Sequence, residues 1–268
     1  MWTSNRHPLV MVDTRMALHP WPGLEPVWEL TGGARNRVVL ARYGNREVVV
    51  RRSGRSSASL EWELDLLEHL GAQGLRVPRL VPAHDGRRYV DGVVVQEFLP
   101  GEPPRSDDDW VRVVEALEGV VHACTVGWPQ RPGFASSSEL LERESGGDIR
   151  LDAMPPELVG QVREAWAAVQ IGPHSVVHGD VGAGNVLMDG GSVGLLDWDE
   201  ARVDVRWFDL GAVPTSTPVS GPVSGQALAA AAVAWETATC WVVEPEYARS
   251  CAPQLAALMH TIPGEQDP

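Results

Sequence analysis

The distribution of apolar and polar positions predicts strands in the first third of the chain and helices further on. Short apolar runs and alternating patterns predict strands over residues 27–30, 37–42 and 47–52. A helix is predicted over residues 57–70, because leucines recur there at helical spacing behind serines that can cap its start. Within residues 88–95, Asp91-Gly92 predicts a hairpin with a two-residue turn.

Longer helical patterns follow a proline-rich segment. Helices are predicted over residues 107–126, 155–169 and 227–243. The 268 residues are enough for a sizeable core, and the change in pattern predicts an α+β fold with two parts. We expect a strand-rich nucleotide-binding lobe at residues 1–98, a connection at 99–105, and a mainly helical lobe at 106–268 that holds catalysis and acceptor binding.

The segment between residues 176 and 200 carries the strongest chemical signal. Asp189-Gly190-Gly191 predicts a turn between two short strands, so that Asn185 and Asp197 lie side by side. A carboxylate and an amide suit Mg²⁺, which keeps waters and binds phosphate oxygens. Asp180 lies on the same loop and can accept the proton of an attacking hydroxyl. Any one of these residues alone would be an ordinary loop residue or turn former.

His178-Gly179-Asp180 with Asn185, followed by Leu196-Asp197-Trp198-Asp199, resembles the aminoglycoside phosphotransferase and choline kinase-like family. The resemblance covers about residues 28–212 and implies a two-lobed protein-kinase-like fold. It implies that Asp180 is the catalytic base, that Asn185 and Asp197 bind Mg²⁺, and that His178 braces the loop. It also implies that Asp209 supports the catalytic loop from beneath.

The chain contains no lysine, so the cation that binds the nucleotide phosphates must be an arginine. Arg51, at the end of a predicted strand, is similar in position to the phosphate-binding cation of the family, and its planar fork suits a bidentate phosphate contact. The resemblance implies that Glu63 on the following helix pairs with Arg51. Glu61 is a competing partner, and Arg52 fits a solvated surface position better.

Two further segments are candidates for nucleotide binding. The small turn at Gly32 and Gly33 allows close approach of phosphates, although a Gly-Gly pair is also typical of an ordinary tight hairpin. The resemblance implies that the backbone of Gln96, Glu97 and Phe98 binds the adenine edge. ATP is the expected nucleotide, with GTP as an alternative.

The charge is divided unevenly. Residues 1–98 carry 13 Arg against 11 Asp and Glu, a net of +2, whereas residues 99–268 carry 9 Arg against 25 acids, a net of −16. An acidic acceptor half disfavours nucleic acid and favours a cationic small molecule. Candidate amine contacts are Asp199, Glu200 and Asp204. The run Asp107-Asp108-Asp109 is a further candidate, or merely caps a helix.

These features predict an ATP- and Mg²⁺-dependent O-phosphotransferase that modifies a hydroxyl of a small cationic molecule, such as an aminoglycoside or another basic antibiotic. The alternatives are a kinase of choline, homoserine or a sugar, and a catalytically silent binding domain. Residues 1–16 lack an uninterrupted apolar signal core, so a cytoplasmic protein is expected. Glu236 breaks the Ala-rich run near 229–234, so no membrane contact is expected. The expected oligomeric state is a monomer or a homodimer. The cysteines Cys124, Cys240 and Cys251 are expected to be reduced.

Overall fold

The structure is a computed structural model that describes residues 6–8, 18–30 and 37–261. Contacts between residues divide the chain into two compact units. The first unit comprises Met1–Pro104 and Ala183–Asp197, and the second comprises Arg105–Gly182 and Trp198–Pro268. The chain therefore passes between the units three times. Two of these passages flank the segment that carries Asn185 and Asp197.

The first unit contains an antiparallel sheet with strand order β1-β2-β3-β4-β5. Its strands are β1 (Arg6–Pro8), β2 (Leu24–Leu30), β3 (Arg37–Tyr43), β4 (Arg46–Arg52) and β5 (Val93–Glu97). The β-branched residues of β4 alternate between faces, so Val48 and Val50 are fully buried in one cluster with Val93 and Val95. Val49 and Arg51 face the opposite side. The predicted turn at Asp91-Gly92 is present, with both residues at positive φ.

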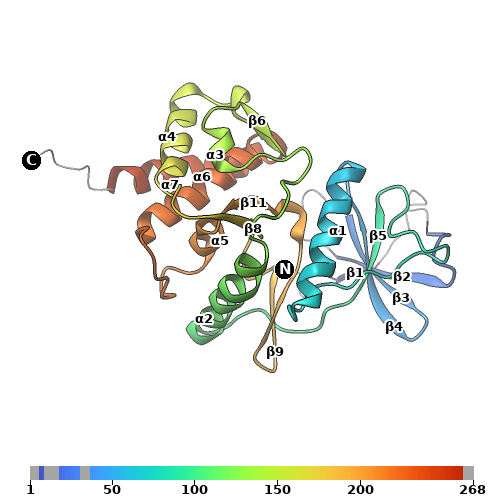
Figure 1. The fold of residues 1–268 in the computed structure, drawn as a ribbon. Helices are drawn as coiled ribbons and strands as arrows, with labels where there is room; N and C mark the ends of the chain where they lie inside the picture. Colours follow the sequence, from blue (N-terminus) through green and yellow to red (C-terminus); the bar gives the residue numbers. More distant parts are fainter. Residues whose placement is uncertain (1–5, 9–17, 31–36, 262–268) are drawn as a thin grey trace, which may run out of the picture. The chain divides into compact units, whose positions relative to one another are not determined.

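Helix α1 (Ser57–Ala72) packs on the Arg51 side of the sheet (Figure 1). Leu60 and Leu64 of α1 form a buried cluster with Val94 of β5. The side chain of Ser56 caps the helix by accepting a hydrogen bond from the backbone N–H of Ser59 at 3.3 Å. The helix predicted from leucine spacing is thus confirmed.

A hairpin from much later in the sequence completes the first unit. Strands β9 (Val186–Asp189) and β10 (Ser192–Leu195) pair antiparallel, and Gly190 and Gly191 between them have φ of 55° and 86°. Positive φ at both central residues is what a tight primed turn requires, and glycine supplies it without strain. Arg76 fixes the hairpin, because its guanidinium donates to Asp189 at 3.1 Å and to the Pro100 carbonyl at 2.7 Å.

The second unit is mainly helical. Its helices are α2 (Asp107–Ala116), a π-helical continuation η1 (Leu117–His122), α3 (Ser137–Leu140), the short η2 (Leu151–Ala153), α4 (Pro156–Ala167), η3 (Trp198–Glu200), α5 (Trp207–Ala212), α6 (Gly225–Val243) and α7 (Pro245–Thr261). Two small strand pairs accompany them: β6 (Ser145–Gly146) with β7 (Ile149–Arg150), and β8 (His174–Val177) with β11 (Arg202–Val205). Ser106 and Asp109 form a capping box at the start of α2. Within the run Asp107-Asp108-Asp109, Asp109 therefore caps the helix, as the alternative to an amine contact predicted.

Helix α6 lies at the centre of the second unit and contacts α4, α5 and α7. Trp235 of α6 packs against Trp166 of α4 with ring centroids 5.5 Å apart. A Cβ on Gly211 of α5 would lie 2.4 Å from the Leu228 carbonyl oxygen, so glycine lets α5 and α6 approach closely. The sequence did not predict α7, which carries Pro253 in its interior.

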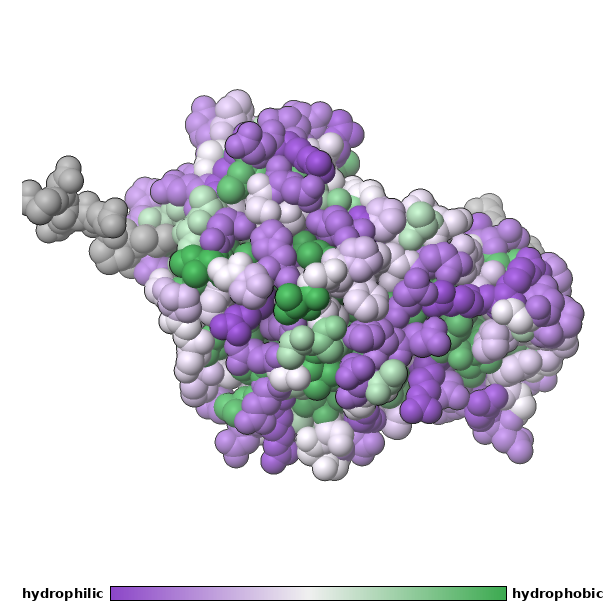
Figure 2. All heavy atoms as spheres, in the orientation of Figure 1, coloured by the Kyte–Doolittle hydropathy of each residue, from purple (hydrophilic) through white to green (hydrophobic). Residues whose placement is uncertain are grey.

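Polar residues cover most of the face drawn in Figure 2. Among the described residues, no helix combines the length and apolar character needed to cross a bilayer. The cysteines Cys124, Cys240 and Cys251 form no disulfide.

Candidate active site

The loop that carries Asp180 begins where β8 ends. Asp180 is exposed, whereas His178 is fully buried. The backbone N–H of Asp180 donates to Nδ1 of His178 at 3.3 Å, and the imidazole packs on Trp198 with centroids 4.6 Å apart. His178 therefore holds the Asp180 backbone through a side chain that is itself fixed by packing.

A second group of contacts supports the same loop from α5. The carboxylate of Asp209 is fully buried and accepts hydrogen bonds from the backbone N–H groups of His178 and Gly179, each at 2.9 Å. It also lies 3.0 Å from Nε2 of His122. Burial raises the pKa of Asp209, but the hydrogen bond and charge of His122, with help from the Gly179 N–H, hold that pKa below its usual value. Asp209 is thus an ionised acceptor beneath the loop.

Gly179 has no room for a side chain. Its φ is +84°, and a Cβ would lie 2.7 Å from the Glu200 carbonyl oxygen and 2.8 Å from Nη1 of Arg202. Gly179→Ala is expected to lower the free energy of unfolding by about 1–2 kcal/mol through left-handed strain and by a further ~1–3 kcal/mol through overpacking. Urea denaturation measures the loss.

Gly127→Ala provides the matched control for that substitution. Gly127 has a similar φ of +77° and no atom within 4 Å of the added Cβ. Only the strain of about 1–2 kcal/mol is expected there. Equal losses in the two variants would show that the space around Gly179 does not matter.

The proposed metal ligands lie in the first unit. The N–H of Leu196 donates to the Asn185 carbonyl at 2.8 Å, so the hairpin register brings Asn185 next to Asp197 along the neighbouring strand. Asp197 has a φ of 56°, a conformation uncommon outside glycine and often found at functional sites. No group of three His, Cys, Asp or Glu side chains suited to a metal occurs among the described residues. One carboxylate and one amide nevertheless fit Mg²⁺, which keeps several waters and substrate oxygens.

Arg51 and Glu63 form a buried ion pair in the first unit. Their relative exposures are 4% and 1%. The competing residue, Glu61, instead accepts a hydrogen bond from Arg88 at 2.8 Å. The pairing inferred from the resemblance is therefore present, and Arg52 is exposed as expected. Gly32 and Gly33 lie outside the described residues.

The segment at the end of β5 is partly used by the fold itself. The N–H of Glu97 donates to the Arg79 carbonyl at 2.8 Å, and the N–H of Phe98 donates to the Glu47 carbonyl at 3.2 Å. These two donors are engaged within the first unit. Adenine recognition by the Gln96–Phe98 backbone would therefore have to use other groups of this segment.

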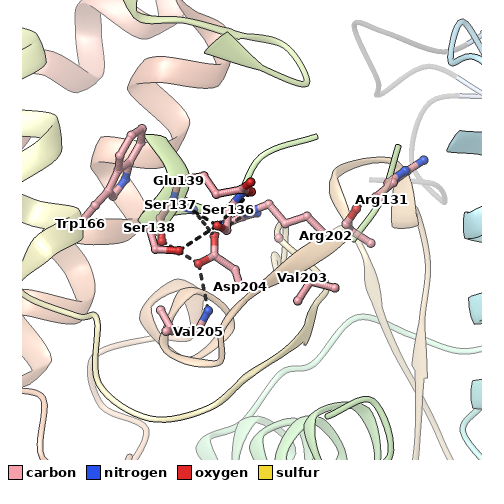
Figure 3. Close-up of polar contacts among 12 residues, drawn as sticks. Arg131, Ser136, Ser137, Ser138, Glu139, Trp166, Arg202, Val203, Asp204 and Val205 are labelled. Atoms are coloured by element: carbon pink, nitrogen blue, oxygen red, sulfur yellow. Dashed lines mark hydrogen bonds and ion pairs between the residues drawn. The ribbon is translucent and has the colours of Figure 1, made fainter. Parts of the chain in front are cut away.

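The three acidic residues considered as amine contacts are buried, with exposures of 6% for Asp199, 8% for Glu200 and 0% for Asp204. Figure 3 shows Asp204 among polar partners. Its carboxylate accepts from the Ser137 N–H at 2.9 Å, the Ser137 hydroxyl at 2.6 Å and Nε of Arg202 at 2.9 Å. Asp204 is thereby committed to holding α3 against β11, which argues against the acceptor contact suggested by its charge.

A buried arginine that the sequence did not single out fixes the turn after Asp197. Nη1 of Arg131 donates to the carbonyls of Trp198, Asp199 and Ala201 at 3.1, 3.0 and 3.0 Å. Neither Arg131 nor His122 lies near the segment from His178 to Asp197 in sequence. No local pattern distinguishes them from surface residues, so only the fold reveals their positions.

Comparison with known proteins gives the family of the chain. A model described as the phosphotransferase enzyme family, APH, matches residues 27–249. The chain belongs to this family. The family inferred from the segment around Asp180 and Asp197 is thus confirmed.

One curated member with detectable similarity is a homoserine kinase of Gluconacetobacter diazotrophicus. It is 28% identical over an alignment of 176 residues, and the match covers 57% of this chain and 52% of the relative. The chain therefore spans about half the length of the curated relative it matches.

Several solved structures share the fold of this chain. A thermostable mutant of the aminoglycoside phosphotransferase APH(4)-Ia has a TM-score of 0.67 at 13% identity, covering 93% of this chain and 99% of that chain. A microcompartment-associated aminopropanol kinase has a TM-score of 0.61 at 18% identity, covering 91% and 94%. The choline kinase LicA from Streptococcus pneumoniae has a TM-score of 0.59 at 16% identity, covering 88% and 92%. The predicted protein-kinase-like fold is confirmed.

Proposed function

We propose that the protein transfers the γ-phosphate of ATP, with Mg²⁺, to a hydroxyl group of a small cationic molecule. The observation that carries the proposal is the exposed carboxylate of Asp180, on a loop whose backbone is held by His178 and Asp209. In this scheme Asp180 aligns the acceptor hydroxyl and accepts its proton.

The groups of the first unit would act on the nucleotide. Arg51, oriented by Glu63, would contact the phosphates, and Asn185 and Asp197 would hold Mg²⁺, which neutralises charge on the phosphate oxygens when bound. Catalysis would then rest on positioning and charge neutralisation, since phosphoryl transfer needs little covalent chemistry from the protein.

The relatives represent two classes of acceptor. Aminoglycoside phosphotransferase and spectinomycin phosphotransferase structures support a basic antibiotic. The homoserine kinase, choline kinase and aminopropanol kinase support a small metabolite. An acceptor screen at fixed ATP and MgCl₂ with ADP detection separates the two classes. The proposal fails if no hydroxyl compound releases ADP and no nucleotide with MgCl₂ raises the melting temperature.

Glu63→Gln is expected to raise the KM for ATP about tenfold, equivalent to roughly 1.4 kcal/mol. The neutral amide cannot balance the buried guanidinium of Arg51, so the cation loses the partner that fixes its geometry. Initial rates at varied ATP concentration measure the change.

Glu61→Gln is the control on the same helix. It removes an equal charge but affects only the more exposed pair with Arg88. An unchanged KM for ATP is expected for this variant. If both variants, or neither, raised that KM, Arg51 would have no special role toward the nucleotide.

A further inference from the structure

A cavity of about 210 Å³ lies within the second unit beside Asp180. It is lined by the loop that carries Asp180 and by α5 and α6, and the lining residues include Asp180, Phe208, Val233, Trp235 and Glu236. Two carboxylates from distant parts of the sequence, Asp180 and Glu236, thus border one space. Every other lining residue is apolar or glycine.

The size of the cavity limits what it can enclose. Pockets that hold drug-sized ligands occupy roughly 300–1,000 Å³, and a water molecule takes up about 30 Å³ in the liquid. The cavity beside Asp180 corresponds to about seven such water volumes. The cavity is open on one side, so it can surround most of a compact molecule, whereas a multi-ring antibiotic would extend out of it.

Glu236 is restrained although it is exposed. The phenol of Tyr247, on α7, donates to Oε2 of Glu236 at 2.6 Å. The hydrogen bond to Glu236 raises the pKa of the Tyr247 phenol, so the phenol remains a donor over the physiological range. Among the described residues, no Arg or His side chain forms an ion pair with Glu236. Its negative charge is therefore available to a ligand.

The chemistry of the walls defines a matching ligand. A hydroxyl must lie within hydrogen-bond reach of Asp180 for proton transfer. The carboxylate of Glu236 favours a cation, and the apolar surface of Phe208, Trp235 and Val233 favours carbon between the two polar ends. A neutral polyol such as a sugar would leave hydroxyl groups against this apolar surface.

We propose that Glu236, positioned by Tyr247, is the residue that selects the acceptor, and that the acceptor is a compact amino alcohol with a single ammonium group. The hydroxyl faces Asp180 and the ammonium group faces Glu236. This inference rests on the phosphotransferase function proposed above. In this proposal the amine is bound by Glu236 of α6 and not by the earlier candidates Asp199, Glu200 and Asp204.

Neutral isosteres of cationic alcohols test the role of the charge. Choline is compared with 3,3-dimethylbutan-1-ol, and 3-aminopropan-1-ol with butan-1-ol, by ADP release at saturating ATP and MgCl₂. The wild-type protein is expected to show a kcat/KM at least tenfold higher for the better cation than for its isostere. Glu236→Gln is expected to reduce that ratio to about one, mainly by raising the KM for the cation.

Two further variants complete the test. Glu246→Gln removes an exposed carboxylate on α7 that does not line the cavity, and should leave the ratio unchanged. Tyr247→Phe removes the hydrogen bond to Glu236 and should raise the KM for the cation severalfold without affecting the neutral alcohol. Calorimetric titration of choline and 3-aminopropan-1-ol without ATP should show the same loss of affinity in Glu236→Gln, independently of turnover.

The outcomes separate this inference from the proposed function. An unchanged ratio in Glu236→Gln, or a preference for a sugar or a multiply charged antibiotic, would overturn the role of Glu236 and leave the phosphotransferase function intact. Absence of ADP release with every hydroxyl compound would overturn both.

Discussion

Asp180→Ala is expected to lower kcat by about 10²- to 10⁴-fold, the usual contribution of a general base. The free energy of unfolding should change by less than ~0.5 kcal/mol, because the substituted side chain is exposed. The backbone of residue 180 would still donate to His178, so the loop should keep its conformation. Steady-state rates of ADP release with an identified acceptor, together with urea denaturation, measure both quantities.

Glu164→Ala is the matched control, since it removes another exposed carboxylate of the second unit, in the middle of helix α4, where no functional role is assigned. Its kcat should equal that of the wild type. The KM for ATP should stay unchanged in Asp180→Ala, because Asp180 is assigned to the acceptor and not to the nucleotide. Wild-type turnover in Asp180→Ala would exclude Asp180 as the base.

Asp209→Ala should produce the opposite pattern, with a large loss of stability. The substitution leaves the N–H groups of His178 and Gly179 without an acceptor and removes the partner of His122. Breaking a buried, charged network of this kind costs about 3–5 kcal/mol. Urea denaturation measures the loss, and kcat should fall as well because the loop beneath Asp180 is no longer held.

Asp152→Ala is the control for that loss, because Asp152 pairs with Arg150 on the surface and should contribute less than about 1 kcal/mol.

The pH dependence of stability gives a second test of Asp209. The pKa of Asp209 is lower in the folded protein than in the unfolded chain, so its contribution is complete above the unfolded pKa of about 3.9 and is lost as the pH falls through the folded value. The difference in stability between wild type and Asp209→Ala should therefore shrink in acid. A difference that persists unchanged at pH 2 would contradict this account.

The parts of the fold that the sequence predicts well depend on local signals. Gly190 and Gly191 fix a two-residue turn, and that turn determines the register that places Asn185 next to Asp197. The leucine spacing likewise identifies helix α1, whereas the choice of Glu63 over Glu61 as the partner of Arg51 came from the family resemblance. In each case a few neighbouring residues carry the information.

The parts that sequence reasoning missed depend on partners far away in the chain. The charge of Asp204 suggested an amine contact, but Ser137 and Arg202 bury and satisfy that carboxylate. Glu236 was noted only as an interruption of an apolar run, and its proposed role follows from its place on α6, which borders the same cavity as Asp180. Net charge indicates that acidic residues are abundant, but not which of them border a cavity.

The β9–β10 hairpin also affects how the protein is made. Its residues complete the first unit, yet they are translated after the whole of Arg105–Gly182. On the ribosome, Arg76 therefore cannot contact Asp189 until the β9–β10 hairpin has left the exit tunnel. A fragment that stops at Pro104 would lack the β9–β10 hairpin of the first unit. No single cut in the sequence therefore separates the gene into two parts that each encode one complete unit.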